Sequence, residues 1–186
     1  MLCYKSVFSG KRLNQAFFNQ PSLAVAKLLL GKYLVVKKGK GINVGQIIET
    51  EAYIGPLDKA NHACRGKTPR TKVMFGSAGR LYVYLIYGMY YCLNIVTERP
   101  GFPAAVLIRS IKPILNISGK TDGPGKLCRE LKISKIDNNL NITKKNSPIY
   151  IIDRGEKPKK IVRACRVGVD YAGIWAEKKW RFIAVF

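Results

Sequence analysis

Histidine and the acidic residues are scarce in this chain of 186 residues. It contains a single histidine, His62, and only 11 Asp+Glu against 33 Lys+Arg. The five cysteines are scattered and form no CxxC pair, so the ligand spacing of a zinc site cannot be assembled. We therefore expect reduced thiols, as in a cytosolic protein, and neither a metal nor another cofactor.

Long apolar runs are also missing. The first apolar stretch of note, residues 23–30, is short and includes Lys27. It falls far below the roughly 20 apolar residues that a membrane-spanning helix needs, and it does not have the form of a secretory signal. The sequence thus predicts a cytoplasmic, nucleoid-associated protein without a membrane partner.

What the chain has in excess is positive charge. Its formal net charge is +22 at pH 7, while 47% of its residues are hydrophobic, which is typical of a folded globule. A basic surface of this size indicates nucleic acid as the partner, and less often an anionic membrane or a ribosome. The length favours one domain over residues 1–186 with a sizeable core.

The apolar periodicity predicts an α+β fold. We expect a mixed, mostly antiparallel, curved β-sheet with a few packed helices and a protruding β-hairpin. Phe8, Leu13, Phe17 and Phe18 are expected to pack onto the body. The predicted helices span 21–31 and a short segment after 123, and the predicted strands span 33–36, 42–54, 81–96 (as a hairpin), 104–111, 149–152, 161–169 and 180–186.

Two carboxylates stand at alternate positions of the predicted strand 42–54. Strict alternation places Ile47, Glu49, Glu51 and Tyr53 on one face, and the simplest interpretation leaves both acids in water. However, Arg109 interrupts the apolar run 104–111. A buried arginine needs an anionic partner, and the two glutamates are the candidates.

The hairpin 81–96 is dense in tyrosine. A tip near Gly88 and Met89 would place Tyr84 opposite Asn94 and Tyr87 at the protruding end. A core hairpin whose tyrosines only bury area is the alternative. Separately, the glycine-rich turn at 123–126 could bind a phosphate through free amides and Lys126, although many helices begin this way.

Five sequence blocks together resemble the alkyladenine (3-methyladenine, methylpurine) DNA glycosylase family. They are ETEAYIGPLDKANH at 49–62, LYVYLIYGMYYCLN at 81–94, AVLIR at 105–109, GPGKLC at 123–128 and RVGVDYAG at 166–173. The long N-terminal extension of vertebrate members is absent, so a compact bacterial-type member is expected. Thr71, where the family usually has Asn, and Ile174, where an acid is common, depart from the pattern.

The resemblance implies a monofunctional, metal-independent enzyme of base excision repair, acting as a monomer on double-stranded DNA. It would flip alkylated or deaminated purines (3-methyladenine, 7-methylguanine, hypoxanthine or ethenoadenine) and hydrolyse the N-glycosidic bond, leaving an abasic site. The implied roles are these: Glu51 is the general base; Arg109 and the carbonyl of Val167 hold the water; Tyr53, His62 and Tyr84 line the base pocket; Asn94 crowds the amine of guanine; and Tyr87 wedges into the duplex. Independently of the resemblance, we expect Arg65 and Arg70 of the basic loop 58–74, and Lys126 of the glycine-rich turn, to contact the DNA backbone.

Two alternatives stay open at the level of sequence. A non-catalytic RNA- or ribosome-binding protein with stacking tyrosines would prefer single-stranded RNA. A metal-dependent nuclease built on Glu49, Glu51 and Asp58 would lose activity in EDTA.

Overall fold

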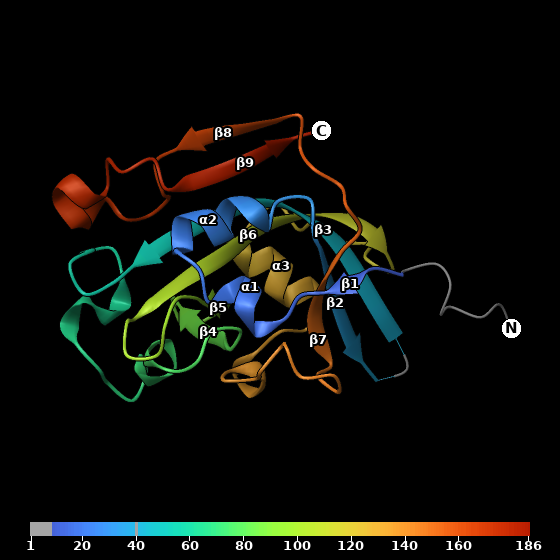
Figure 1. The fold of residues 1–186 in the computed structure, drawn as a ribbon, viewed down its shortest axis with the longest axis horizontal. Helices are drawn as coiled ribbons and strands as arrows, with labels where there is room; N and C mark the ends of the chain where they lie inside the picture. Colours follow the sequence, from blue (N-terminus) through green and yellow to red (C-terminus); the bar gives the residue numbers. More distant parts are fainter. Residues whose placement is uncertain (1–8, 40) are drawn as a thin grey trace, which may run out of the picture.

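A computed structural model describes residues 9–39 and 41–186, so Phe8 lies outside the described residues. One β-sheet of nine strands dominates it (Figure 1). The strands are β1 (Lys11–Arg12), β2 (Tyr33–Lys38), β3 (Gly41–Ile54), β4 (Leu81–Ile86), β5 (Tyr90–Val96), β6 (Ala104–Leu115), β7 (Ile149–Asp153), β8 (Lys160–Ala164) and β9 (Arg181–Val185). The helices are α1 (Gln15–Phe18), α2 (Ser22–Leu28) and α3 (Pro124–Glu130), with 3₁₀ turns η1 (His62–Arg65), η2 (Lys72–Phe75), η3 (Lys135–Asp137) and η4 (Asp170–Trp175).

The long strand β3 is the branch point of this sheet. The main path runs β1-β7-β2-β3-β6-β5-β4, and β9 adds to β3 and carries β8. Along one edge β3 pairs with β2 up to residue 46 and with β9 from residue 49, and along the other edge it pairs with β6. These pairings are antiparallel, which confirms the predicted α+β class.

The main core lies where α2 and α3 cover the sheet. Helix α2 packs on β3 and β6, and α3 packs on β5 and β6. Phe18, Leu29, Leu93, Ile108 and Phe182 are among its fully buried side chains. Burying each such side chain is worth about 1.5–3 kcal/mol. As predicted, Leu13 and Phe18 are buried in this core and Phe17 packs against it.

A paired irregularity between β3 and β6 overturns the predicted alternation. Ile47 pairs with Ile111, Glu49 with Ser110 and Thr50 with Ile108, so Ile48 is an extra residue in β3 and Arg109 an extra one in β6. A bulge adds one residue and thereby reverses which face the following side chains occupy. Ile47 therefore lies on the same face of β3 as Ala52, in the core cluster, and not on the face of Glu51 as predicted. Glu51 is fully buried, whereas the simplest interpretation of the sequence placed it in water.

The hairpin β4–β5 forms as predicted, but its register differs. Tyr84 pairs with Cys92, and Asn94 pairs with Tyr82 rather than Tyr84. The chain reverses at Tyr87 and Gly88, whose φ angles are 50° and 70°, and the Met89 amide donates to the carbonyl of Ile86 at 3.1 Å. Positive φ at both central positions is characteristic of a tight hairpin turn. The predicted tip lies one residue closer to the C-terminus than the observed tip. Each residue of one strand therefore pairs with a residue two positions away from its predicted partner.

One further boundary was wrong in a way that concerns the site. The predicted strand 161–169 ends at Ala164, and residues 165–169 form a loop in which Gly168 has φ of 71°. The predicted loop after Asp58 contains the turns η1 and η2. Within the described ranges no helix is both long and apolar enough to cross a bilayer.

Candidate active site

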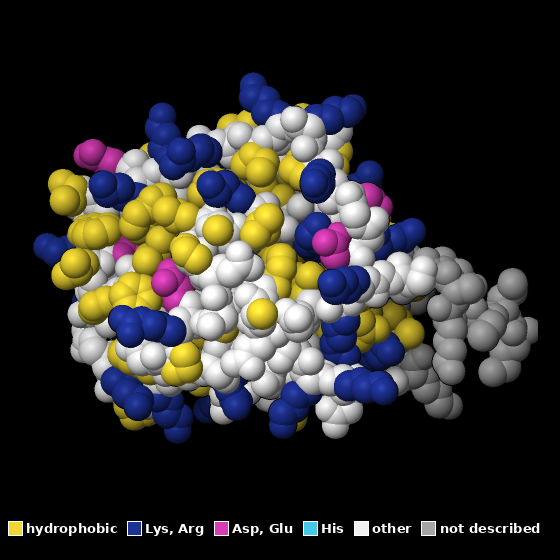
Figure 2. All heavy atoms as spheres, in the orientation of Figure 1, with side chains coloured by type: hydrophobic (Ala, Val, Ile, Leu, Met, Phe, Trp, Pro, Cys, Tyr) yellow, Lys and Arg dark blue, Asp and Glu magenta, His cyan; other side chains and the backbone are white. Residues whose placement is uncertain are grey.

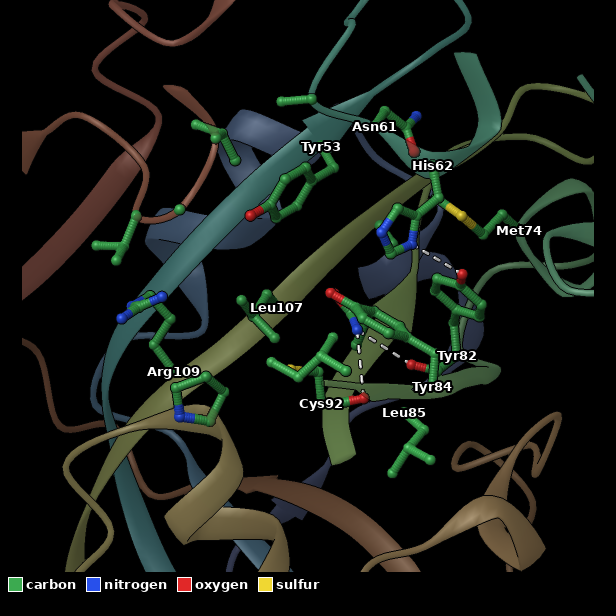
Figure 3. A pocket seen from close by; sticks show the side chains of 18 of the residues that line it. Tyr53, Asn61, His62, Met74, Tyr82, Tyr84, Leu85, Cys92, Leu107 and Arg109 are labelled. Carbon is green, nitrogen blue, oxygen red and sulfur yellow. Dashed lines mark hydrogen bonds between the residues drawn. The ribbon is translucent and has the colours of Figure 1, made fainter. Parts of the chain in front are cut away.

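A cavity of about 480 Å³ opens between β3, the hairpin β4–β5, β6, the loop before η2 and the loop that follows β8. Its size falls in the range of about 300–1,000 Å³ that is usual for small-ligand sites. Figure 3 shows Tyr53, His62, Tyr84 and Arg109 converging on it from separate elements. Among the predicted site residues, the cavity is lined by Tyr53, His62, Arg70, Tyr84, Tyr87, Asn94, Arg109 and Val167.

Glu51 lies fully buried beside this cavity, with both carboxylate oxygens engaged. The amide of Val167 donates to Oε1 at 2.9 Å, and the phenol of Tyr53 donates to Oε2 at 2.8 Å. Arg109 Nη1 lies 3.4 Å from Oε1. The expected pairing of a buried arginine with the glutamates is therefore present.

Glu49 secures the other side of Arg109. Its Oε1 accepts from Arg109 Nε at 3.1 Å and from Arg181 Nη1 at 3.3 Å. Because Arg109 is the extra residue of the β6 bulge, its guanidinium reaches both carboxylates of β3 at once. The two glutamates thus share one arginine, and only Glu51 is completely shielded from solvent.

Burial raises the pKa of Glu51 above its ordinary value. Arg109, the Val167 amide and the Tyr53 hydroxyl each lower that pKa, but burial outweighs them. The same burial, together with the Glu51 carboxylate, raises the pKa of Tyr53 well above its usual range. Tyr53 consequently stays protonated and remains a hydrogen-bond donor to Glu51.

The aromatic wall contains a neutral histidine. His62 Nδ1 lies 3.0 Å from the Tyr82 hydroxyl, and its ring meets that of Tyr84 edge-on with centroids 4.5 Å apart. Burial, followed by the nearby charges of Arg70 and Arg65, lowers the pKa of His62 to about 4. The imidazole is therefore uncharged at neutral pH.

Asn94 and Arg70 border the same wall. The buried Asn94 side chain donates from Nδ2 to the carbonyl of Tyr82 at 3.1 Å, which fixes its orientation at the cavity wall. The Arg70 guanidinium lies 5.0 Å from the centroid of the Tyr84 ring, within the range of a cation–π contact. A positive charge therefore neighbours the ring of Tyr84, for which the family resemblance predicts a role in base binding.

Comparison with known proteins identifies the scaffold. The family model described as methylpurine-DNA glycosylase matches residues 16–185. The chain belongs to this glycosylase family. It is 47% identical over 173 residues to a protein of Myxococcus xanthus (91% of this chain, 88% of the relative), and 45% identical over 179 residues to one of Legionella pneumophila strain Corby (92% and 93%). A protein of Methanocella arvoryzae is 47% identical over 183 residues (91% and 90%). All three carry the name "Putative 3-methyladenine DNA glycosylase".

Membership makes the chain a DNA glycosylase of the methylpurine type, which is a hydrolase of N-glycosyl bonds with DNA as its substrate. Its surface is consistent with a polyanionic partner. Figure 2 shows many Lys and Arg side chains spread over one face of the glycosylase and few acidic ones between them.

The remaining predicted residues occupy the periphery of the glycosylase. Arg65 ends η1, and Lys126 lies in α3 with Nζ 3.0 Å from Asp122 Oδ1. Of the two departures from the family pattern, Thr71 is buried and donates to the carbonyl of Gly66 at 3.0 Å, whereas Ile174 is exposed. Thr71 therefore holds the loop internally.

Sequence reasoning missed the buried pair Asp58–Arg166. Arg166 donates from Nη1 to Asp58 Oδ2 at 2.6 Å and from Nη2 to Oδ1 at 2.8 Å. The signal was available, since Arg166 opens one of the matched blocks. This pairing also weakens the nuclease alternative, because Asp58 is held by Arg166 and Glu49 by two other arginines. Among the residues that the structure describes, no three His, Cys, Asp or Glu are grouped as metal ligands.

Proposed function

We propose that this glycosylase is monofunctional, acts as a monomer on double-stranded DNA, and excises alkylated or deaminated purines with a water molecule activated by Glu51. The observation that carries the proposal is the environment of Glu51. A buried carboxylate with a raised pKa is held by a main-chain amide, a phenol and an arginine, and the residues that supply these three groups line a cavity walled by aromatic rings. Such a group suits proton abstraction near neutral pH.

The chemical step resembles glycoside hydrolysis. The C1′–N bond breaks with its electron pair leaving on the purine, so the sugar passes through an oxocarbenium-like state. Water forms the new C1′–O bond and gives its proton to Glu51, whose negative charge also stabilises the cationic sugar. Arg109 and the carbonyl of Val167 hold that water. Assistance by a general base is typically worth about 10²- to 10⁴-fold in rate.

The cavity wall would select the base. A purine inside a duplex is unreachable and must be flipped out, at a cost of a few kcal/mol that is smallest for damaged pairs. The rings of Tyr53, His62 and Tyr84 offer π faces to it, and an alkylated purine, being cationic or electron-poor, gains more from them. A neutral His62 adds no opposing charge. Asn94 would crowd the exocyclic amine of guanine.

The exposed hairpin tip would occupy the gap that the base leaves. Tyr87 is 83% exposed, which is unusual for a large ring and accords with a role against DNA rather than in the core. Stacking between a ring and a base is worth about 1–3 kcal/mol. Arg65, Arg70 and Lys126 would contact the flanking phosphates and set the salt dependence of binding.

The experiment is base release in EDTA. Duplex DNA carrying one hypoxanthine, and alkylated genomic DNA, would be incubated with the wild-type protein and with Glu51→Gln, and released bases separated by chromatography. We expect release by the wild type, none by Glu51→Gln, and lesion binding by both. Glu156→Gln is the matched control, because Glu156 also accepts hydrogen bonds, from Tyr33 and Gln46, but in a separate cluster. Activity of Glu51→Gln near that of the wild type would remove Glu51 from its role, and a wild type that binds without releasing base would favour the RNA-binding alternative.

A further inference from the structure

The pair Asp58–Arg166 is the most completely buried ion pair that the structure describes, with both side chains fully shielded from solvent. Besides its two bonds to Asp58, Arg166 donates to the carbonyl of Ala52 at 2.9 Å and to the carbonyl of Trp175 at 2.9 Å. Asp58 in turn accepts from the amides of Ile54 and Ala60. One guanidinium thus ties together β3, the loop after β3 and the turn η4.

Arg166 also braces both hydrogen-bond donors of Glu51. Val167, whose amide donates to Oε1, directly follows Arg166 in the loop between β8 and η4, and its side chain is half exposed. A half-exposed side chain provides little packing that could hold the Val167 amide in place. Tyr53, whose hydroxyl donates to Oε2, presents its ring to the Arg166 guanidinium at 4.8 Å from the centroid. Arg166 itself does not line the cavity.

We infer that Arg166, paired with Asp58, is a positioning residue for Glu51: it holds the Val167 amide and the Tyr53 hydroxyl where they bind the two carboxylate oxygens. The inference rests on the proposed role of Glu51 as the base. Arginine is required because its planar guanidinium bonds a carboxylate through two parallel hydrogen bonds and lies flat on an aromatic ring, whereas an ammonium group does neither.

The consequence concerns when Glu51 is ionised. The charged and titratable groups around Glu51 are Glu49 and Tyr53 of β3, Cys92 of β5, Arg109 of β6 and Arg181 of β9. Arg166 acts on this set only through Tyr53 and Val167. If both donors move away, the carboxylate loses two contacts that lower its pKa, so Glu51 stays protonated to a higher pH. A base must be deprotonated to act, and the acid limb of the rate profile must therefore move to higher pH.

The test is single-turnover excision from lesion DNA across pH, comparing the wild type with Arg166→Lys. The acid limb should move up by about one pH unit, the size expected for weakening hydrogen bonds to a charged group. The rate below the limb should fall about tenfold, since one unit is a factor of ten. Affinity for lesion DNA should change less than twofold, because Arg166 is outside the cavity.

The control separates positioning from general stability. Lys32→Met breaks another mostly buried ion pair, in which Lys32 Nζ lies 2.8 Å from Asp153, in a separate part of the sheet. It should lower the melting temperature and leave the acid limb in place. An unmoved acid limb in folded Arg166→Lys, with the wild type active, would overturn the inference, whereas an inactive wild type would instead overturn the proposed function.

Two further tests apply if Arg166→Lys does not fold: a second variant, and a measurement on the wild type. Asp58→Asn removes one carboxylate charge from the pair and should shift the acid limb in the same direction. If neither variant folds, hydrogen exchange in the wild type decides. The Val167 amide should be protected like the amide of Ala52, which donates to the Trp180 carbonyl at 2.9 Å inside the sheet. If the Val167 amide exchanges as fast as an amide in an unstructured peptide, the inference is refuted.

Discussion

Replacing Tyr53 by phenylalanine tests how the fold sets the proton affinity of Glu51. The change deletes the hydroxyl that donates to Oε2 at 2.8 Å and keeps the ring that faces the cavity. A hydrogen bond to a charged group is worth about 1.5–3 kcal/mol, and one pKa unit corresponds to about 1.36 kcal/mol. The pKa of Glu51, already raised by burial, should therefore rise further, by about 1–2 units.

This shift predicts a specific rate profile. Excision requires ionised Glu51, so the Tyr53→Phe enzyme should lose about 10- to 100-fold in rate below the acid limb and approach the wild-type rate on the alkaline plateau. Single-turnover rates on hypoxanthine DNA between pH 5 and 9 would measure it. Tyr33→Phe is the matched control, because the Tyr33 phenol also donates to a carboxylate, that of Glu156. A Tyr53→Phe profile that is lower at every pH without a displaced limb would refute the reasoning.

Two other properties follow from the site. The pKa of His62 is lowered from 6.5 to about 4 in the fold, so the unfolded state takes up the proton first and the protein should lose about 3 kcal/mol of unfolding free energy as the pH falls from 6.5 through 4. Urea unfolding should show this loss to be absent in His62→Gln, and an equal loss in that variant would contradict it. Tyr87→Ala should weaken binding to lesion DNA by about 1–3 kcal/mol, measured by fluorescence anisotropy. Leu57→Ala, which removes another exposed apolar side chain, is its control, and unchanged affinity of Tyr87→Ala would return Tyr87 to a structural role.

The sequence is a good guide where the physics is local. Strands 33–36 and 104–111 and the hairpin 81–96 follow from short patterns of β-branched and aromatic residues, and the structure has each of them. The candidate residues from β3, the hairpin and β6 converge on one cavity, as their blocks imply. Their roles stay predictions until the excision experiments are done.

The errors arise where one residue changes a register or where partners are remote in the chain. The alternation of 42–54 contains no sign of the extra Ile48. The hairpin tip was predicted near Gly88 and Met89, but the turn lies at Tyr87 and Gly88, where the non-glycine Tyr87 also adopts a positive φ of 50°. Asp58 and Arg166 are 108 positions apart, so no local pattern links them. A burial-driven pKa such as that of Glu51 likewise depends on packing from β6, the β8–η4 loop and β3 together.

The compensating bulges of β3 and β6 make this part of the chain intolerant of changes in length. Ile48 and Arg109 are each one residue in excess, and the two excesses cancel, so the pairing beyond residue 50 resumes. Alternation is strict beyond the bulges, so adding or removing one residue between Glu51 and Tyr53 would turn the Tyr53 ring from the cavity into the core. Substitutions can vary here, but a single-residue insertion or deletion at 52 should abolish activity, whereas deleting Ile48 alone would return β3 to simple alternation with Glu51 on its present face.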